Sequence, residues 1–307
     1  MRTGRAVCVS ARVDGRSRRD SANIPVLLDA GAPTQGWIVA RRERNARGVS
    51  RFLAALALIA AAPQAQPPVA TPTATVPVLT ARVVHRYPHD PAAFTEGLLF
   101  RDGALYESTG MEGRSEVRRV ALATGKVTLR AKIAPGEFGE GLASWGNQLV
   151  SLTWHGGIAH RWDARTLKRV GGGRYVGEGW GLASDGRHLI HSDGTPTLRF
   201  LDPATLKVVR QVTVTLNGKQ VSQVNELEVV DGAVLANVWH TPYLIRIDPA
   251  DGRVTALVDL RPVVAEITAS DPEAVANGIA WDAAGKRLFV TGKLWPTLFE
   301  IALDATN

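Results

Sequence analysis

Five chemically active side chains recur at equivalent points of a repeated sequence pattern. Each repeat has an apolar alternating run, a glycine-bearing turn of two to four residues and a second alternating run. The repeats begin at Glu96, Glu140, Trp180, Asn225 and Asn277, at spacings of 44, 40, 45 and 52 residues. Carboxylates transfer protons, amides donate hydrogen bonds, and indoles make a dry wall that raises the pKa of a neighbouring carboxyl group. These residue types indicate a binding or catalytic site.

Three further side chains follow the starts of their repeats at nearly constant distances of 14, 14 and 16 residues: Trp154, Trp239 and Lys293. A tryptophan at the end of a strand is commonly a packing anchor. A ring that also contains carboxylates, amides and an ammonium has no evident structural purpose, because charged groups are costly to bury unless they are paired. A ligand pocket is therefore the better interpretation.

The repeats also predict the elements that position these side chains. Each repeat begins with a β-hairpin pattern, and each of the first four continues into a second strand pair with a tight turn. Four short strands per 40–50 residues is typical of a β-propeller blade. The alternative, a β-sandwich, fits less well because the period is so regular. The sequence predicts an all-β protein with five blades.

The last repeat is one strand short, since it ends with LFEIAL near the C-terminus. Residues 78–86, VLTARVVHR, supply an alternating strand at the other end of the propeller. We therefore expect this N-terminal strand to pair beside residues 298–303 and to close the five-bladed ring without an unpaired edge. In such a ring the first strand of each blade lines the central channel, so the repeat starts should gather at one mouth.

The N-terminal quarter of the chain has a different character. Residues 52–62, FLAALALIAAA, are too short an apolar run to span a bilayer and fit a secretory signal peptide over residues 49–65. Residues 1–48 are then a gene-model extension before a start at Val49, or alternatively a disordered basic leader. The composition of residues 66–77 predicts a flexible linker. Residues 78–307 are expected to form the propeller domain, which would carry the site. We expect export to the periplasm or outside, without a stable membrane span after cleavage.

Charge and cysteine content exclude several classes of function. The formal charge of the 307-residue chain is +7, and residues 1–51 carry all of it, which leaves the rest neutral and without a basic surface for nucleic acid. The single cysteine, Cys8, excludes a disulfide framework and a cysteine metal cluster. The seven histidines lack zinc-ligand spacings. We expect no metal and no cofactor at the site, and a monomer.

The motifs at the repeat starts resemble those of the plant-type and bacterial glutaminyl-peptide cyclotransferases, or glutamine cyclotransferases. The resemblance covers residues 80–303 and rests on HDPAAFTEGLLF, LYESTGMEGRSEVRRVAL, FGEGLASWGNQLVSLTW, YVGEGWGLASDG, HLIHSDGTPTLRFLDP, VNELEVVDGAVLANVW, NGIAWD and LFVTGKLWP. It implies a five-bladed propeller that acts on peptides or proteins with N-terminal Gln. The implied reaction forms N-terminal pyroglutamate and releases ammonia.

The resemblance also implies roles for individual residues. Glu140 in FGEGL is the catalytic carboxylate, and the aromatic pocket consists of Trp154, Trp180 and Trp239. Asn225 and Lys293 fill polar positions. The position of Glu96 is commonly Gln in the plant members, so its role here is either to hold the substrate amine or to raise the pKa of Glu140.

The chemistry of cyclisation fits these residue types. The α-amine must be neutral to attack the side-chain carbonyl carbon, and the leaving nitrogen must gain a proton, so one carboxylate near indoles can serve both steps. We expect Glu140 to be this proton shuttle. The oxyanion needs fixed donors, which Lys293 and the Asn225 amide can supply. The tryptophans form a dry wall for the methylenes of the Gln side chain.

Two other classes of function remain open from the residues alone. In a metal-dependent lactonase of the propeller type, carboxylate and amide side chains hold a divalent cation, and such a set is available here: Glu96, Glu140, Asn225 and Asn277. A non-catalytic propeller would bind peptide N-termini without releasing ammonia.

Overall fold

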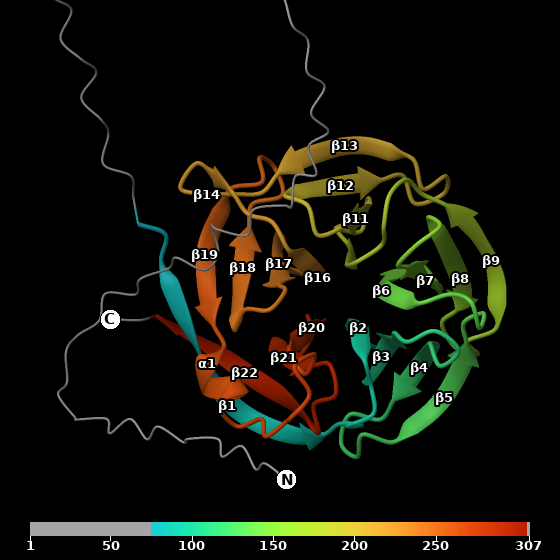
Figure 1. Cartoon of the computed structure of the whole chain (residues 1–307), viewed down its shortest axis with the longest axis horizontal. Helices are drawn as coiled ribbons and strands as arrows, with labels where there is room; N and C mark the ends of the chain where they lie inside the picture. Colours follow the sequence, from blue (N-terminus) through green and yellow to red (C-terminus); the bar gives the residue numbers. More distant parts are fainter. Residues whose placement is uncertain (1–74, 306–307) are drawn as a thin grey trace, which may run out of the picture.

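Five four-stranded antiparallel units surround a central channel in the computed structural model, which describes residues 75–305 (Figure 1). The first strand of each repeat lies nearest the channel, and the later strands lie progressively further out. The predicted five-bladed β-propeller is therefore confirmed. The predicted extension at 1–48 and the signal peptide at 49–65 lie outside the described residues, as does most of the linker at 66–77.

Blades 1 to 3 each come from one continuous stretch of chain. Blade 1 contains β2 (Thr95–Arg101), β3 (Ala104–Thr109), β4 (Glu116–Val120) and β5 (Val127–Lys132). Blade 2 contains β6 (Gly139–Trp145), β7 (Gln148–Thr153), β8 (Ile158–Asp163) and β9 (Arg169–Arg174). Blade 3 contains β10 (Leu182–Ser184), β11 (Leu189–His191), β12 (Thr197–Leu201) and β13 (Val208–Thr213).

Blades 4 and 5 share one eight-stranded sheet. Blade 4 contains β16 (Val224–Val230), β17 (Ala233–Val238), β18 (Tyr243–Ile247) and β19 (Val254–Asp259). Blade 5 contains β20 (Ala276–Asp282), β21 (Arg287–Gly292), β22 (Thr297–Ala305) and β1 (Val78–Pro88). The antiparallel pairing of β1 with β22, which sets Ala81 opposite Leu303, closes the ring as predicted.

The closing strand also makes a pairing that the sequence did not predict. Residues 78–80 at the start of β1 pair in parallel with β19, where Val78 lies opposite Leu257. A strand of eleven residues is long enough to run along the outer edges of both neighbouring blades. The same strand therefore covers two edges that would otherwise be open to unwanted pairing.

Apolar side chains between neighbouring blades form the core. One buried cluster joins blade 1 to blade 2 and includes Tyr106, Val117, Leu142, Leu149 and Trp162. Strands in the middle of a blade are covered on both faces, so every residue of β3 and of β17 is buried. The outer strand β9 is exposed along its whole length and contains three glycines. Packing between blades thus holds the inner strands in place.

Two insertions interrupt the regular repeats. A short hairpin, β14 (Thr215–Leu216) with β15 (Lys219–Gln220), lies between blades 3 and 4. The helix α1 (Arg261–Val264) and the loop at 265–275 lie between blades 4 and 5, which explains the longest repeat spacing. Across residues 75–305, no helix is long and apolar enough to cross a membrane.

Candidate active site

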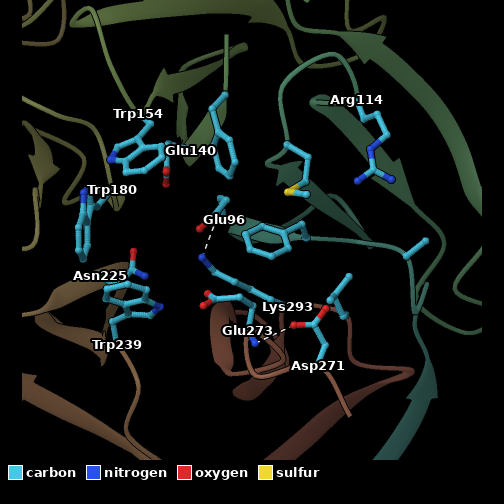
Figure 2. A pocket seen from close by; sticks show the side chains of 15 residues that line it. Glu96, Arg114, Glu140, Trp154, Trp180, Asn225, Trp239, Asp271, Glu273 and Lys293 are labelled. Atoms are coloured by element: carbon cyan, nitrogen blue, oxygen red, sulfur yellow. Dashed lines mark hydrogen bonds and ion pairs between the residues drawn. The ribbon is translucent and has the colours of Figure 1, made fainter. Parts of the chain in front are cut away.

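A cavity of about 580 Å³ opens at one mouth of the channel. All seven site residues predicted from the sequence line it: Glu96, Glu140, Trp154, Trp180, Asn225, Trp239 and Lys293. Figure 2 shows Glu96 and Lys293 near the centre, Glu140 beside them, and three tryptophans along one side. The structure thus brings together side chains from all five blades. The eighth candidate, Asn277, does not line the cavity, but its amide donates a hydrogen bond to Glu96.

The hairpin geometry explains why residues 14 to 16 positions apart meet at this mouth. The start of each inner strand pairs with the end of the second strand, as Gly139 does with Thr153. The next residue on the second strand continues the pairing by a backbone hydrogen bond. Trp154, Trp239 and Lys293 all donate such a bond from their backbone N–H groups, at 2.9–3.0 Å. The two sets of predicted residues therefore lie at the same end of the channel.

Irregular pairing at the inner strands turns the polar side chains toward the cavity. In four of the five inner strands the register shifts near the start, and each shift spans one candidate residue: Glu96, Glu140, Asn225 or Asn277. Such a β-bulge leaves the extra residue out of the ladder and re-aims its side chain. In blade 3 the corresponding Trp180 lies just before β10 and donates a backbone bond to the Ser192 carbonyl.

A glycine follows the candidate residue in four of the five repeats, because neighbouring inner strands nearly touch there. A Cβ atom on Gly141 would lie 2.4 Å from the backbone nitrogen of Leu182 in the next blade. Blade 4 has Glu226 at this position instead. The buried Glu226 carboxylate accepts backbone bonds from Leu98 and Ile279 at 3.2 and 2.9 Å, and so ties three inner strands together.

Glu140 has a buried carboxylate without a hydrogen-bond partner among the described residues. Only 6% of the residue is exposed, and the side chain points into the cavity (Figure 2). Burial raises the pKa of Glu140 well above its ordinary value, and the nearby negative charge of Glu96 raises it further. The positive charge of Lys293 opposes this rise without cancelling it. A carboxyl group in this condition keeps its proton to a higher pH than an exposed glutamate does.

Glu96 and Lys293 form a buried ion pair at the centre of the site. The Lys293 ammonium donates to Glu96 Oε1 at 2.7 Å, and the Asn277 amide donates to Glu96 Oε2 at 3.1 Å. Burial raises the pKa of Glu96, while Lys293 works in the opposite direction. Lys293 also lies 4.5 Å from the ring centre of Phe94. The ammonium is thus fixed in the cavity, and its remaining protons can serve a ligand.

Aromatic rings form one wall of the cavity. Trp180 and Trp239 meet edge to face with ring centres 5.5 Å apart, and Trp154 meets Phe138 in the same manner at 5.6 Å. Trp154 is 38% exposed and lies at the rim, whereas the other two are partly buried. Edge-to-face contacts favour these orientations of the rings. The three indoles together form one wall of the cavity.

Several buried polar atoms at this mouth have no partner in the part of the chain that the structure describes. They are the Asn225 side-chain oxygen, the Asn277 side-chain oxygen and the indole nitrogen of Trp239. Leaving such an atom unpaired typically costs about 1–3 kcal/mol. Unpaired atoms on residues that line a cavity are therefore candidates for ligand contacts. Within residues 75–305, no three His, Cys, Asp or Glu side chains are grouped so that they could hold a metal ion.

The chain matches known proteins along the whole propeller. A family model described as glutamine cyclotransferase matches residues 52–303. The chain belongs to this family. The predicted enzyme class is confirmed as well. The glutaminyl-peptide cyclotransferase of Arabidopsis thaliana is 44% identical over 229 residues, which cover 73% of this chain and 72% of that protein. The crystal structure of Myxococcus xanthus glutaminyl cyclase has a TM-score of 0.71 and 39% identity, and covers 76% of this chain and 100% of that one.

In this glutamine cyclotransferase family member, sequence reasoning missed part of the cavity lining. Phe94 and Phe138 each stand two residues before a predicted glutamate, inside motifs already noted, and they line the cavity. Asp271 and Glu273 come from the loop after α1, which has no counterpart in the other repeats. Glu178 lies outside the cavity lining but accepts hydrogen bonds from two of the tryptophans. The sequence could have indicated Glu178 through its position in the motif GEGWGL, two residues before Trp180.

Proposed function

We propose that this protein converts the N-terminal Gln of peptides or proteins to pyroglutamate and releases ammonia. The observation that carries the proposal is the buried carboxylate of Glu140, which has no hydrogen-bond partner within residues 75–305 and shares one cavity with an ammonium and an aromatic wall. Family membership supports the same reaction. Both reacting groups belong to one substrate residue, so the enzyme must mainly fold the side chain back and move protons.

Glu140 serves as the proton shuttle in this proposal. The substrate α-amine nitrogen attacks the side-chain carbonyl carbon, and its proton passes to the Glu140 carboxylate. The tetrahedral intermediate then collapses, the bond from carbon to the side-chain nitrogen breaks, and Glu140 returns the proton to the departing ammonia. The raised pKa of Glu140 suits both proton transfers, because it brings the pKa of the carboxyl group closer to the pKa of the substrate amine.

Lys293 and Asn225 stabilise the negative charge that develops on the carbonyl oxygen. The Lys293 ammonium keeps protons available after it donates to Glu96, and the Asn225 amide lies across the cavity. The indole N–H of Trp239, which has no partner in the part of the chain that the structure describes, is a third donor. Donors that are fixed before the reaction begins need no reorganisation in the transition state.

Glu96 acts through its charge. Its carboxylate holds the Lys293 ammonium in place and raises the pKa of Glu140. This arrangement supports the second of the two roles considered from the sequence, in which Glu96 tunes the shuttle. Trp154, Trp180 and Trp239 provide the apolar wall against which the methylenes of the Gln side chain pack.

Incubation of the purified protein with a Gln-initiated peptide tests the proposal. The expected result is a mass loss of one ammonia per peptide together with free ammonia in solution. A peptide with an acetylated N-terminal Gln is the matched control and should remain unchanged, because its nitrogen cannot attack. Intact Gln-initiated peptide after prolonged incubation with folded protein would contradict the proposal.

The same assay separates the two alternative classes. Cyclisation by the proposed route needs only side chains of this protein, so the rate should survive treatment with EDTA. A metal-dependent lactonase would lose its activity with the chelator and would hydrolyse lactones. In this protein the Lys293 ammonium already neutralises Glu96, which disfavours a dication at that carboxylate. A peptide-binding propeller would retain the peptide without releasing ammonia.

We also propose that the protein is exported. The apolar run at 52–62 and the proline-rich stretch after it support a cleaved signal peptide. N-terminal sequencing of the natural product tests this proposal and the start at Val49 together. Peptides from residues 1–48 in that product would contradict the proposed start.

A further inference from the structure

One carboxylate outside the cavity lining joins two of the cavity's tryptophans. Glu178 lies between β9 and β10, and its side chain is 47% exposed. Its Oε2 atom accepts hydrogen bonds from both indole nitrogens, at 3.0 Å from Trp154 and 3.1 Å from Trp180. Trp154 follows the second strand of blade 2, whereas Trp180 precedes the first strand of blade 3. A single oxygen atom therefore links the aromatic walls of two blades.

The backbone around Glu178 is held on both sides. His191 donates from Nε2 to the Glu178 carbonyl oxygen at 2.7 Å, and the Gly179 N–H donates to the Trp154 carbonyl at 3.1 Å. Burial lowers the pKa of His191 to about 4, so the imidazole stays neutral above that pH and keeps a single N–H for this bond. The segment that carries the carboxylate is thus fixed relative to Trp154.

The glycine next to Glu178 is required by close contact. A Cβ atom on Gly179 would collide with the hydroxyl oxygen of Tyr175 and would lie 2.8 Å from the carbonyl oxygen of Thr153. A larger residue would push the segment outward and carry the carboxylate away from the indoles. The local sequence is therefore suited to placing one acceptor between two indole donors.

We propose that Glu178 is a positioning residue that fixes the ring planes of Trp154 and Trp180 before substrate binds. Trp154 needs such an anchor because it is exposed at the rim, where packing alone restrains a side chain weakly. An indole N–H is only a donor, and a carboxylate oxygen has room to accept from two donors at once. The inference rests on the proposed function, since the wall it fixes is the one that holds the substrate methylenes.

Two substitutions at Glu178 separate hydrogen-bond acceptance from other effects. Glu178→Ala removes the acceptor, whereas Glu178→Gln keeps a carbonyl oxygen at nearly the same place. We expect Glu178→Ala to raise KM for a Gln-initiated peptide about tenfold with a smaller change in kcat, because the wall contacts substrate and transition state alike. Glu178→Gln should stay within about threefold of the unsubstituted enzyme. Asp231→Asn, which removes an exposed carboxylate paired with Lys286, is the control and should change neither constant.

A spectroscopic measurement tests the same inference without any turnover. The indole N–H signals of Trp154 and Trp180 can be assigned in a ¹H–¹⁵N spectrum of the free protein from Trp154→Phe and Trp180→Phe. Glu178→Ala should shift both signals and speed their exchange with solvent, while Glu178→Gln and Asp231→Asn should leave the exchange slow. A merely structural contact elsewhere in the blade would not move these two signals together.

Each outcome bears on the proposal. Unchanged KM and unchanged indole signals in Glu178→Ala would overturn it. Equal damage in Glu178→Gln and Glu178→Ala, with both proteins folded, would also overturn it, because charge rather than acceptance would then be the cause. If the unsubstituted protein released no ammonia, the proposed function would fail, and the indole signals would still decide whether Glu178 holds the two rings.

Discussion

Two buried glutamates in neighbouring blades differ in what surrounds them. Glu107 on β3 accepts hydrogen bonds from Arg118 at 2.7 Å, from Thr95 at 2.7 Å and from His89 at 3.1 Å. Glu140 on β6 accepts none from the described residues. Burial alone would raise the pKa of both groups, yet His89 and Arg118 outweigh it at Glu107 and lower that pKa to about 2, whereas the pKa of Glu140 is raised.

The difference separates a carboxylate in a structural network from the carboxylate that we propose to be reactive. The partners of Glu107 join the two ends of the ring, because His89 also hydrogen-bonds the carbonyl oxygen of Trp295 in blade 5 at 2.7 Å. The Glu107 carboxylate therefore stays ionised, and its hydrogen bonds hold it in a fixed network. Glu140 accepts no hydrogen bond from the described residues, and its pKa is raised by burial, as the proposed proton shuttle requires. Both glutamates are buried. The presence or absence of hydrogen-bond partners, rather than burial, therefore indicates which role each carboxylate has.

The largest expected effect comes from neutralising the unpartnered carboxylate. Glu140→Gln should lower kcat by about 10²–10⁴, the usual range for losing general acid–base catalysis, because the amide cannot accept and return the proton. Binding of a Gln-initiated peptide should survive, since the shape of the cavity is kept. Steady-state kinetics and calorimetric titration of the peptide measure the two effects separately.

Stability should not fall in the same variant. Replacing a buried, unpaired carboxylate by a neutral amide removes a desolvation penalty, so the free energy of unfolding should stay equal or rise. Denaturant unfolding checks this expectation. A Glu140→Gln protein with near-normal kcat would show that another group moves the proton.

The same substitution at the partnered carboxylate should have the opposite outcome. Glu107→Gln leaves the buried guanidinium of Arg118 without its closest countercharge and should lower the free energy of unfolding by about 3 kcal/mol. The protein that remains folded should keep its kcat, because neither Glu107 nor its hydrogen-bond partners line the cavity. Denaturant unfolding and kinetics on the same samples measure both quantities.

An exposed ion pair on the closing strand is the control for Glu107→Gln. Arg82 pairs with Asp304 across β1 and β22, with both side chains more than half exposed. Asp304→Asn should change the free energy of unfolding by less than about 1 kcal/mol, as exposed pairs contribute little. An equally small effect in Glu107→Gln would contradict the structural role of the buried network.

Two tryptophans differ in the same way as the two glutamates, because within residues 75–305 only one of them has a hydrogen-bond partner for its indole nitrogen. The buried Trp295 donates from Nε1 to the carbonyl of Ala274 at 2.9 Å, whereas the indole nitrogen of Trp239 has no partner among the described residues. Trp239→Ala should lower kcat/KM about 10–100-fold and weaken peptide binding, because it removes a wall used by ground state and transition state alike. Trp295→Ala should instead lower the free energy of unfolding, which thermal unfolding would detect. The reverse result would refute this division of roles.

The repeated sequence predicted most of what is periodic in the molecule. The blades, the closing strand and the meeting of residues such as Glu140 and Lys293 at one mouth follow from recurring hairpins, since equivalent positions in a ring lie at the same end of the channel. The bulges that aim these side chains inward were not predicted, because alternation in the sequence does not show where the register shifts. The pairing of Val78 beside Leu257 depends on how two blades approach, which no local pattern records.

Residues without a counterpart in the other repeats were missed for a related reason. The loop that carries Glu273 occurs once, between blades 4 and 5, so no periodicity pointed to it. Glu107 lies in an alternating strand like many surface residues, and its partners His89 and Arg118 come from other segments. Whether a buried carboxylate is paired depends on the folded neighbourhood, and here pairing distinguishes Glu107 from Glu140, for which we propose a catalytic role.

A smaller loss of activity than at Glu140 is expected at Glu96, which accepts hydrogen bonds from Lys293 and Asn277 but lines the cavity. Glu96→Gln should lower kcat/KM less than about tenfold, well below the loss at Glu140, because the amide can still accept from Lys293. The negative charge that raises the pKa of Glu140 is lost, and the Lys293 ammonium then acts on Glu140 without its countercharge. Both changes lower the pKa of Glu140. Since the shuttle must be ionised to accept the amine proton, the acidic limb of the kcat/KM profile should move to lower pH. If Glu96→Gln were as damaging as Glu140→Gln, the two carboxylates would act as a coupled pair and a single shuttle would be wrong.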